Sequence, residues 1–295
     1  MKKKEVIKGE MEIKEPDYSN TLKVNKSGVW DQKILIGTPM TGMLRAEWVL
    51  ARFGQVIPTN WSSTDTYPSV STYAPLRYLV ADAQNLIVKS AIERKVEWTL
   101  FIEHDNMIPP NCFILLNEYM RDKKIPVVSG LYFTKSVPPE PMIYRESGRS
   151  FYTNWHLGDK VWCSGIPMGT TLIHTSILQK MWDESPEYMI GTDMVRRVFD
   201  APAKVWYDPA AGGFQTAAGT SDLNWCKRVM TEGFFEKAGW GKYQKMQYPF
   251  LVDTNIFVRH VDEMGRMFPI ELPARYNPLP KKEPELVTVH KGPHK

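Results

Sequence analysis

The stretch VEWTLFIEHDNMIPP, residues 96–110, brings together the side chains of this sequence that are best suited to chemistry. Its first half, 96–102, is rich in β-branched and aromatic residues and predicts a buried strand. Four polar residues follow, and then a proline pair that no strand ladder can continue through. A buried strand whose end delivers Glu103 and Asp105 into a loop is typical of ligand and metal sites in α/β sheets. The alternative is a solvated strand end that leads into a helix cap.

Alternating strands and helices are expected to position these acids. Buried apolar runs predict strands at 33–39, 55–61, 96–102 and 125–133, and helical periodicity predicts helices at 44–54, 74–95 and 111–124. Such alternation implies an α/β fold with a mixed, mostly parallel sheet and helices on both faces. The later part of the chain predicts strands near 161–173, 205–208 and 251–261, a flexible Gly/Ala loop over 209–219 that could act as a lid, and a helix beginning near Ser221.

Composition sets the class of protein. The 295 residues are 43% hydrophobic, enough for a full core, and 37 basic residues nearly offset 33 acidic ones, for a net charge of +4. This balance argues against a nucleic-acid partner but allows an anionic small ligand. One domain is expected over residues 31–265, between a polar N-terminal arm at 1–30 and a Pro/Lys-rich C-terminal tail at 266–295.

The expected location is cytoplasmic. The three cysteines are odd in number and far apart and form no CxxC pair, which favours a reducing compartment. The N-terminal 20 residues lack the apolar core of a secretory signal, and no apolar stretch is long enough for a transmembrane segment.

Three segments, in this order, resemble the GT-A fold glycosyltransferases with a DxD motif (family-2-like): FIEHDNMIPP, GTSDLNWCKRV and DTNIFVRHVD. The resemblance covers about residues 32–262. It implies a Rossmann-like nucleotide-diphospho-sugar transferase fold, a donor such as a UDP- or GDP-sugar, and a Mn²⁺ or Mg²⁺ cofactor. Three departures stand out: Glu103 rather than an aspartate takes the first acidic position, Ser221 replaces the first acid of the second motif, and Gln84 stands where an arginine is common.

The resemblance also implies roles for individual residues. Glu103 and Asp105 take the two acidic positions of the DxD motif, with His260 as a third metal ligand, and Asp222 takes the catalytic position. A glutamate at the first position shifts the expectation for Glu103 from direct ligation toward a water-mediated or ribose contact. Contacts to the donor are expected from Thr38, Pro39, Arg77, Asn85, Glu103, His104, Gly130 and Gly169.

Each of these residues also has an ordinary structural explanation. Strand alternation points His104 away from a ligand that faces its two neighbours, which favours a structural role for it. His260 could simply bind nearby backbone, and Asp222 could simply cap a helix, with Thr220 or Ser221 as the N-cap residue.

The chemistry explains why these residue types suit the site. A nucleoside diphosphate is a poor leaving group until a divalent cation neutralises its developing charge. Such a cation needs only one or two carboxylates besides the phosphates, and an imidazole ligand favours Mn²⁺ over Mg²⁺. Asp222 would act as general base toward the acceptor hydroxyl in an inverting transfer, which is favoured over retention.

The sequence therefore predicts a metal-dependent glycosyltransferase of the hexosyltransferase type, with a carbohydrate or another hydroxyl compound as acceptor. A nucleotidyltransferase of related fold is one alternative, although GTPMTGMLR is only a weak version of its basic Gly-rich loop. A non-catalytic nucleotide-sugar-binding or scaffold protein is the other, which Glu103 and Ser221 favour. The sequence leaves the base, the sugar, the acceptor and the oligomeric state open.

Overall fold

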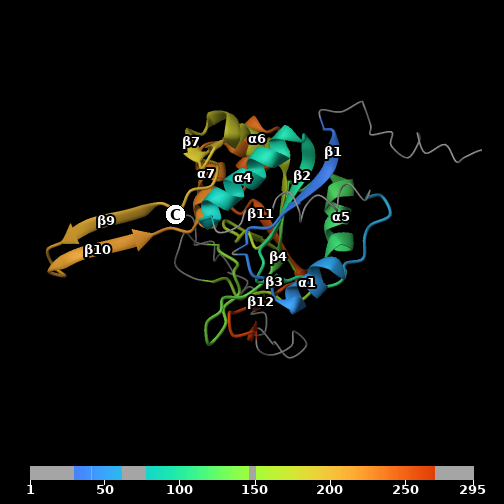
Figure 1. Ribbon diagram of the computed structural model, residues 1–295, viewed down its shortest axis with the longest axis horizontal. Helices are drawn as coiled ribbons and strands as arrows, with labels where there is room; N and C mark the ends of the chain where they lie inside the picture. Colours follow the sequence, from blue (N-terminus) through green and yellow to red (C-terminus); the bar gives the residue numbers. More distant parts are fainter. Residues whose placement is uncertain (1–29, 41, 62–77, 146–150, 270–295) are drawn as a thin grey trace, which may run out of the picture.

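A six-stranded sheet with the order β1-β2-β6-β4-β11-β5 forms the centre of the computed structural model, which describes residues 30–40, 42–61, 78–145 and 151–269 (Figure 1). The strands are β1 (Gln32–Gly37), β2 (Val96–Ile102), β6 (Thr170–His174), β4 (Val127–Leu131), β11 (Phe250–Phe257) and β5 (Lys160–Cys163). Strands β1 and β2 are parallel, as are β4 and β11, whereas β6 and β5 are antiparallel to their neighbours. Four of the six strands thus run in one direction, which confirms the predicted mixed, mostly parallel sheet.

Helices cover both faces of this sheet, as predicted. One face carries α4 (Val80–Glu93), α6 (Thr175–Glu184), α7 (Ser221–Thr231), α8 (Phe234–Lys237) and α9 (Gly241–Gln244), and the other carries α1 (Ala46–Phe53) and α5 (Cys112–Asp122). The alternation of side chains along each strand divides the core between the two faces. Val127, for example, packs in the α4–α6–α7 cluster, whereas Val128 packs in the α1–α5 cluster.

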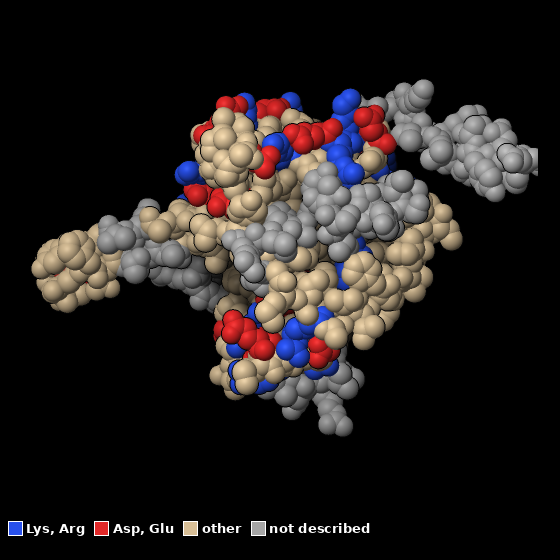
Figure 2. All heavy atoms as spheres, in the orientation of Figure 1, with Lys and Arg blue, Asp and Glu red and all other residues tan. Residues whose placement is uncertain are grey.

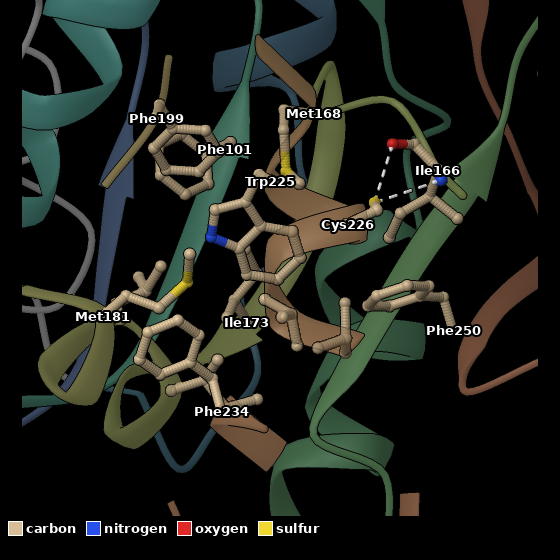
Figure 3. Packing of buried hydrophobic residues seen from close by; sticks show 14 of the residues in the cluster. Phe101, Ile166, Met168, Ile173, Met181, Phe199, Trp225, Cys226, Phe234 and Phe250 are labelled. Atoms are coloured by element: carbon tan, nitrogen blue, oxygen red, sulfur yellow. Dashed lines mark hydrogen bonds between the residues drawn. The ribbon is translucent and has the colours of Figure 1, made fainter. Parts of the chain in front are cut away.

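Aromatic packing fixes α7 against the sheet. The indole of Trp225 stacks on Phe199 with ring centroids 5.8 Å apart and lies 5.9 Å from Phe250 (Figure 3). The neighbouring Cys226 thiol donates to the carbonyl of Ile166 and accepts from its amide, both at 3.5 Å. Helix α7 is therefore held beside the turn that enters β6, and its first residue, Ser221, is where the sequence predicts it.

A bulge in β11 directs the chain after it. Asp253 pairs with Gly130 and Phe257 with Leu131, so three residues of β11 have no partner in β4. The missing side chain of Gly130 makes room for them, since a Cβ there would lie 2.9 Å from Ile256. Beyond the bulge the chain forms β12 (Arg259–Val261), which pairs with β3 (Asn106–Met107) on one side and β13 (Met267–Phe268) on the other.

Two local predictions are wrong. Residues 55–61 form no strand: Pro58 lies among them, and Gln55 instead donates to the carbonyls of Ala51 and Pro109. The Gly/Ala stretch is also not a loop, because most of it forms β10 (Gly213–Ala218), paired with β9 (Ala203–Asp208) in a hairpin that projects from the body (Figure 1). Its role as a lid stays a prediction. A second hairpin joins β7 (Glu187–Ile190) and β8 (Asp193–Arg196).

The predicted arm and tail lie almost wholly outside the described residues, and the predicted domain limits stay a prediction. Within the described ranges, no helix is long and apolar enough to cross a membrane. Charged side chains on the face shown in Figure 2 gather over α4 and α6 and again around β3 and β12.

The bulge gives a first prediction. The Tyr119 hydroxyl of α5 donates to Asp253 at 2.5 Å, and the other oxygen of this buried carboxylate accepts from the amide of Asn255 at 3.0 Å. Tyr119→Phe removes one partner of a buried carboxylate, so we expect the free energy of unfolding to fall by about 1–3 kcal/mol. Urea unfolding measures the loss. Tyr207→Phe is the control, because Tyr207 is 57% exposed; equal stability of the two variants would contradict this role of Asp253.

Candidate functional site

The ends of the parallel strands bring the predicted acids to one edge of the sheet. Because β1, β2, β4 and β11 run in the same direction, the residues that follow them meet at this edge, where antiparallel β6 begins. The amide of Glu103, just after β2, donates to the carbonyl of Gly169, just before β6, at 2.9 Å. The carbonyl of Asp105 accepts from Val261 of β12 at 2.8 Å. Segments far apart in the sequence thus form one polar site.

Asp105 contacts two groups that can carry positive charge. Its Oδ2 lies 2.5 Å from Nζ of Lys135 and 3.2 Å from Nε2 of His260. Burial alone would raise the pKa of Asp105, but the hydrogen bond and charge of His260 and those of Lys135 hold it well below its usual range. Asp105 is therefore an ionised carboxylate.

The orientation of His260 is set by the backbone. Its Nδ1 lies 2.8 Å from the carbonyl of Phe133. Because a carbonyl only accepts, Nδ1 donates to it, and Nε2 is the nitrogen that forms the hydrogen bond with Oδ2 of Asp105, in the position that a metal ion would take. A histidine that donates one ring N–H to a carbonyl and presents the other nitrogen beside a carboxylate has the arrangement of a metal ligand.

These two side chains fit the metal that the resemblance implies. Oδ1 of Asp105 is buried without a hydrogen-bond partner, and imidazole with carboxylate is a donor set for Mn²⁺. Two protein ligands suffice when phosphate oxygens complete the shell. In the described ranges no three His, Cys, Asp or Glu side chains lie close enough together to hold a metal ion. Direct ligation by Glu103 thus stays a prediction without support from the geometry.

Glu103 lies in a different environment from Asp105. Its backbone carbonyl accepts from the indole of Trp48 at 2.9 Å and from the amide of Asn106 at 3.1 Å, which fixes the turn after β2. The residue is half-buried, and burial raises the pKa of its carboxyl well above 4.5; the negative charges of Asp222 and Asp105 raise it further. The Glu103 carboxyl thus holds its proton at pH values at which an ordinary glutamate is ionised.

Asp222 is the third acid at this edge of the sheet. It lies in the first turn of α7, and three hydrogen-bond donors hold its carboxylate. They are Nε2 of Gln84 at 3.2 Å, Oγ of Ser221 at 3.1 Å and the amide of Met168 at 3.1 Å. Burial raises the pKa of Asp222, and these hydrogen bonds oppose the rise. The predicted N-cap is confirmed separately, since Thr220 Oγ1 accepts from the amide of Leu223. The Asp222 side chain itself is thus not the cap.

A buried amide without partners lies between these acids. Asn106 is fully buried, and neither Oδ1 nor Nδ2 has a hydrogen-bond partner. It pairs with His260 in the β3–β12 ladder and packs against Gly169, where an added Cβ would lie 1.8 Å from Nδ2 of Asn106 and 2.5 Å from the hydroxyl of Tyr132. Gly169 therefore permits the close approach of Asn106 and Tyr132, and its expected contact with the donor stays a prediction. Buried polar atoms are rarely left unpaired, so the Asn106 amide is an unusual feature of this edge of the sheet.

The remaining residues that were expected to contact the donor lie in different surroundings. Thr38 lies at the end of β1 with a buried, unpartnered hydroxyl, and the carbonyl of Pro39 lies 3.2 Å from Nδ1 of His104. Gly130 lies inside the sheet, at the β11 bulge. The amide of Asn85 is occupied, because it bonds the backbone of Phe199 at 2.8 and 2.9 Å and the hydroxyl of Tyr188 at 2.8 Å. The predicted contact Arg77 lies outside the described residues.

Sequence reasoning missed three side chains of the site. Lys135 follows β4 in the loop at the same edge as the acids, so a search of the residues after every parallel strand would have found it. Asn106 is part of the motif itself but received no role. Gln84 was noted only as a replacement for arginine, whereas the fold uses it to orient Asp222.

No family model matches the sequence, and no curated protein matches it. Solved structures with some likeness include A197 from STIV, with 14% identity, 79% of this chain and 87% of that chain covered, and a TM-score of 0.45. S. aureus TarS 1–349 in complex with UDP has 14% identity, coverage of 52% and 50%, and a TM-score of 0.33. A Bacillus anthracis protein assigned as a glucose-1-phosphate thymidylyltransferase, in complex with a sucrose, has 10% identity, coverage of 52% and 76%, and a TM-score of 0.28.

The raised pKa of Glu103 predicts a pH effect on stability. This group stabilises the fold fully below its ordinary pKa of 4.5, and that contribution is lost as the pH rises through the folded pKa. The side chain of Glu103→Gln does not titrate, so the variant does not lose this stability as the pH rises. Its melting temperature relative to wild type should therefore rise between pH 4 and pH 8 in EDTA buffer. Glu93→Gln, at a 64% exposed side chain, is the control. A Glu103→Gln variant that follows wild type at every pH would contradict this environment.

Proposed function

We propose that this chain is a metal-dependent glycosyltransferase of the GT-A type. It transfers a sugar, of the hexose type, from a nucleotide-diphosphate donor such as a UDP- or GDP-sugar to the hydroxyl of a carbohydrate or another acceptor. The observation that carries the proposal is the pairing of Asp105 with His260, at the edge where the parallel strands end. A second, separately held carboxylate, Asp222, lies at the same edge and supplies the base that such a transfer needs.

Asp105 and His260 are the residues that would hold Mn²⁺, or Mg²⁺. When bound, the ion would neutralise the charge that develops on the diphosphate as the leaving group departs. Asp105 is suited to this role because it is ionised and its Oδ2 lies 3.2 Å from Nε2 of His260. Thr38, which has an unpartnered hydroxyl just after β1, would bind the ribose or base of the donor, and Glu103 would bind a donor hydroxyl.

Asp222 would act on the acceptor. As the bond between the anomeric carbon and the phosphate oxygen breaks and the bond from the acceptor oxygen forms, the hydroxyl proton passes to the Asp222 carboxylate. The donors from Gln84, Ser221 and Met168 hold this carboxylate in one orientation, and its raised pKa makes it a stronger base. One base that acts on the attacking oxygen suits an inverting transfer.

The nucleotidyltransferase alternative gains no support from the loop after β1. Its basic residue, Arg45, pairs with Glu47 at 3.1 Å, and both side chains are more than one-third exposed. The described part of this loop is thus not arranged as a basic phosphate-binding cradle.

A thermal-shift experiment tests the proposal. UDP, GDP, UDP-glucose, UDP-galactose and GDP-mannose are each added with Mn²⁺ or with EDTA. We expect nucleotides of one base to raise the melting temperature in Mn²⁺, because a ligand at 100 times its Kd stabilises the folded state by about 2.7 kcal/mol. Asp105→Ala should lose the metal-dependent part of the shift.

The matched control is Asp193→Ala, at a 51% exposed carboxylate that pairs with Lys89 away from the site. It should keep the full shift. A Mn²⁺-dependent shift that survives in Asp105→Ala would place the metal elsewhere, and no shift with any compound would contradict the proposed donor class.

The role of Asp222 gives a separate prediction. Asp222→Asn keeps the size of the side chain but removes its ability to accept a proton, so we expect kcat to fall by about 10²–10⁴-fold. The thermal shift with donor should persist. Sugar release from the donor that the panel identifies, to an acceptor or to water, measures kcat, with Asp193→Asn as the control. A kcat within a few-fold of wild type would exclude Asp222 as the base.

A further inference from the structure

Lys135 lies on a loop whose two ends are tied together. The amide of Thr134 donates to the carbonyl of Glu140 at 2.9 Å, and the amide of Glu140 donates back to Oγ1 of Thr134 at 3.0 Å. Phe133 and Pro141 form an isolated bridge just outside this pair. A closed loop of this kind limits where Lys135 can reach, and it presents the ammonium group to Asp105 at 2.5 Å.

The contact of Lys135 coincides with the position that the proposed metal requires. Its Nζ and Nε2 of His260 share the same oxygen, Oδ2 of Asp105. A divalent ion held by Asp105 and His260 would therefore meet the Lys135 ammonium at close range, where two positive charges repel. Lys135 therefore cannot keep its present contact with Oδ2 of Asp105 while a divalent ion binds the same oxygen.

The charges around Lys135 favour a role in binding a diphosphate. Asp105 and Asp222 each interact electrostatically with Glu103, and Lys135 is a cation whose charge acts on both Glu103 and Asp105. A diphosphate that approaches this cluster of acids, of which Asp105 is ionised, needs positive charge in its path. The Lys135 side chain is 34% exposed, so it is open to a ligand while it contacts Asp105.

An ammonium group suits a shared role of this kind. It has three N–H donors on a flexible four-carbon stem, so it can leave one oxygen for another without movement of the backbone. The loop fixes the Cα position of Lys135 and leaves the end of the side chain free to choose between a carboxylate and a phosphate.

We propose that Lys135 is the diphosphate-binding residue of this site and that it competes with the divalent ion for Asp105 until the diphosphate binds. This inference rests on the proposed function and deepens it. Two opposite effects follow for a variant without the ammonium group. Metal alone should bind more tightly, and a nucleoside diphosphate without metal should bind more weakly.

The test compares the full-length chain with Lys135→Met, Lys135→Arg and Lys123→Met. Lys123 is a matched control because its Nζ also lies 2.5 Å from a carboxylate, that of Glu97, which lies near the start of β2 at the opposite edge of the sheet. Binding of Mn²⁺ alone is measured by electron paramagnetic resonance. Binding of UDP and GDP is measured by calorimetry in Mn²⁺ and in EDTA.

For Lys135→Met we expect the Kd for Mn²⁺ to fall roughly tenfold and the Kd for the bound nucleotide in EDTA to rise roughly tenfold, about the effect of one charge-assisted hydrogen bond. Lys135→Arg should retain nucleotide binding, and Lys123→Met should match wild type in both. Unchanged constants in Lys135→Met, with wild type binding Mn²⁺ and nucleotide, would overturn the inference and leave the proposed function intact. Failure of wild type to bind either ligand would overturn both.

Discussion

Four strands that run in one direction bring their ends to the same edge of the sheet, and the polar site depends on this constraint. The loop after β2 carries Glu103 and Asp105, the loop after β4 carries Lys135, and the chain beyond β11 carries His260. Antiparallel β6 begins at the same edge, so Gly169, just before it, lies beside Glu103 and accepts from its amide. The β11 bulge completes the arrangement, because its unpaired residues let the chain turn into β12 and place His260 opposite Asn106.

The three acids of the site are alike in chemistry and differ in environment. Asp105 contacts Lys135 and His260 and stays ionised, Asp222 is held by three neutral donors, and Glu103 holds its proton because burial and its acidic neighbours oppose ionisation. Environments that push the pKa values of neighbouring carboxyls apart are typical of sites in which each has its own task. The roles proposed above, metal binding for Asp105, proton transfer for Asp222 and a donor contact for Glu103, would follow this division.

Local patterns predicted most elements of this fold because their signals lie within short windows. The β-branched run before Glu103 and the periodicity of α4 are examples, and the start of α7 follows from Thr220, a good N-cap residue. Strand β10 was missed because its Gly and Ala residues suggest a loop, whereas backbone pairing with the predicted strand β9 stabilises it. Apolar residues at 55–61 suggested a strand, but a strand also needs a neighbour to pair with.

The site was harder to predict where its contacts join distant parts of the chain. The resemblance placed Asp105 and His260, 155 residues apart, in one site, and the structure brings them within 3.2 Å. The pairing of Lys135 with Asp105 depends on how the loop after β4 closes, and the donation from Gln84 to Asp222 depends on how α4 packs beside α7. Neither contact has a sequence pattern, because each arises from the packing of complete elements.

A crystal structure with UDP or GDP and Mn²⁺ bound tests the central claim most directly. Anomalous scattering locates manganese independently of the protein map. The account predicts that the manganese peak lies beside the Asp105 carboxylate and Nε2 of His260, with the nucleotide diphosphate bound next to it. Manganese and nucleotide bound away from the edge where β1, β2, β4 and β11 end would contradict the claim.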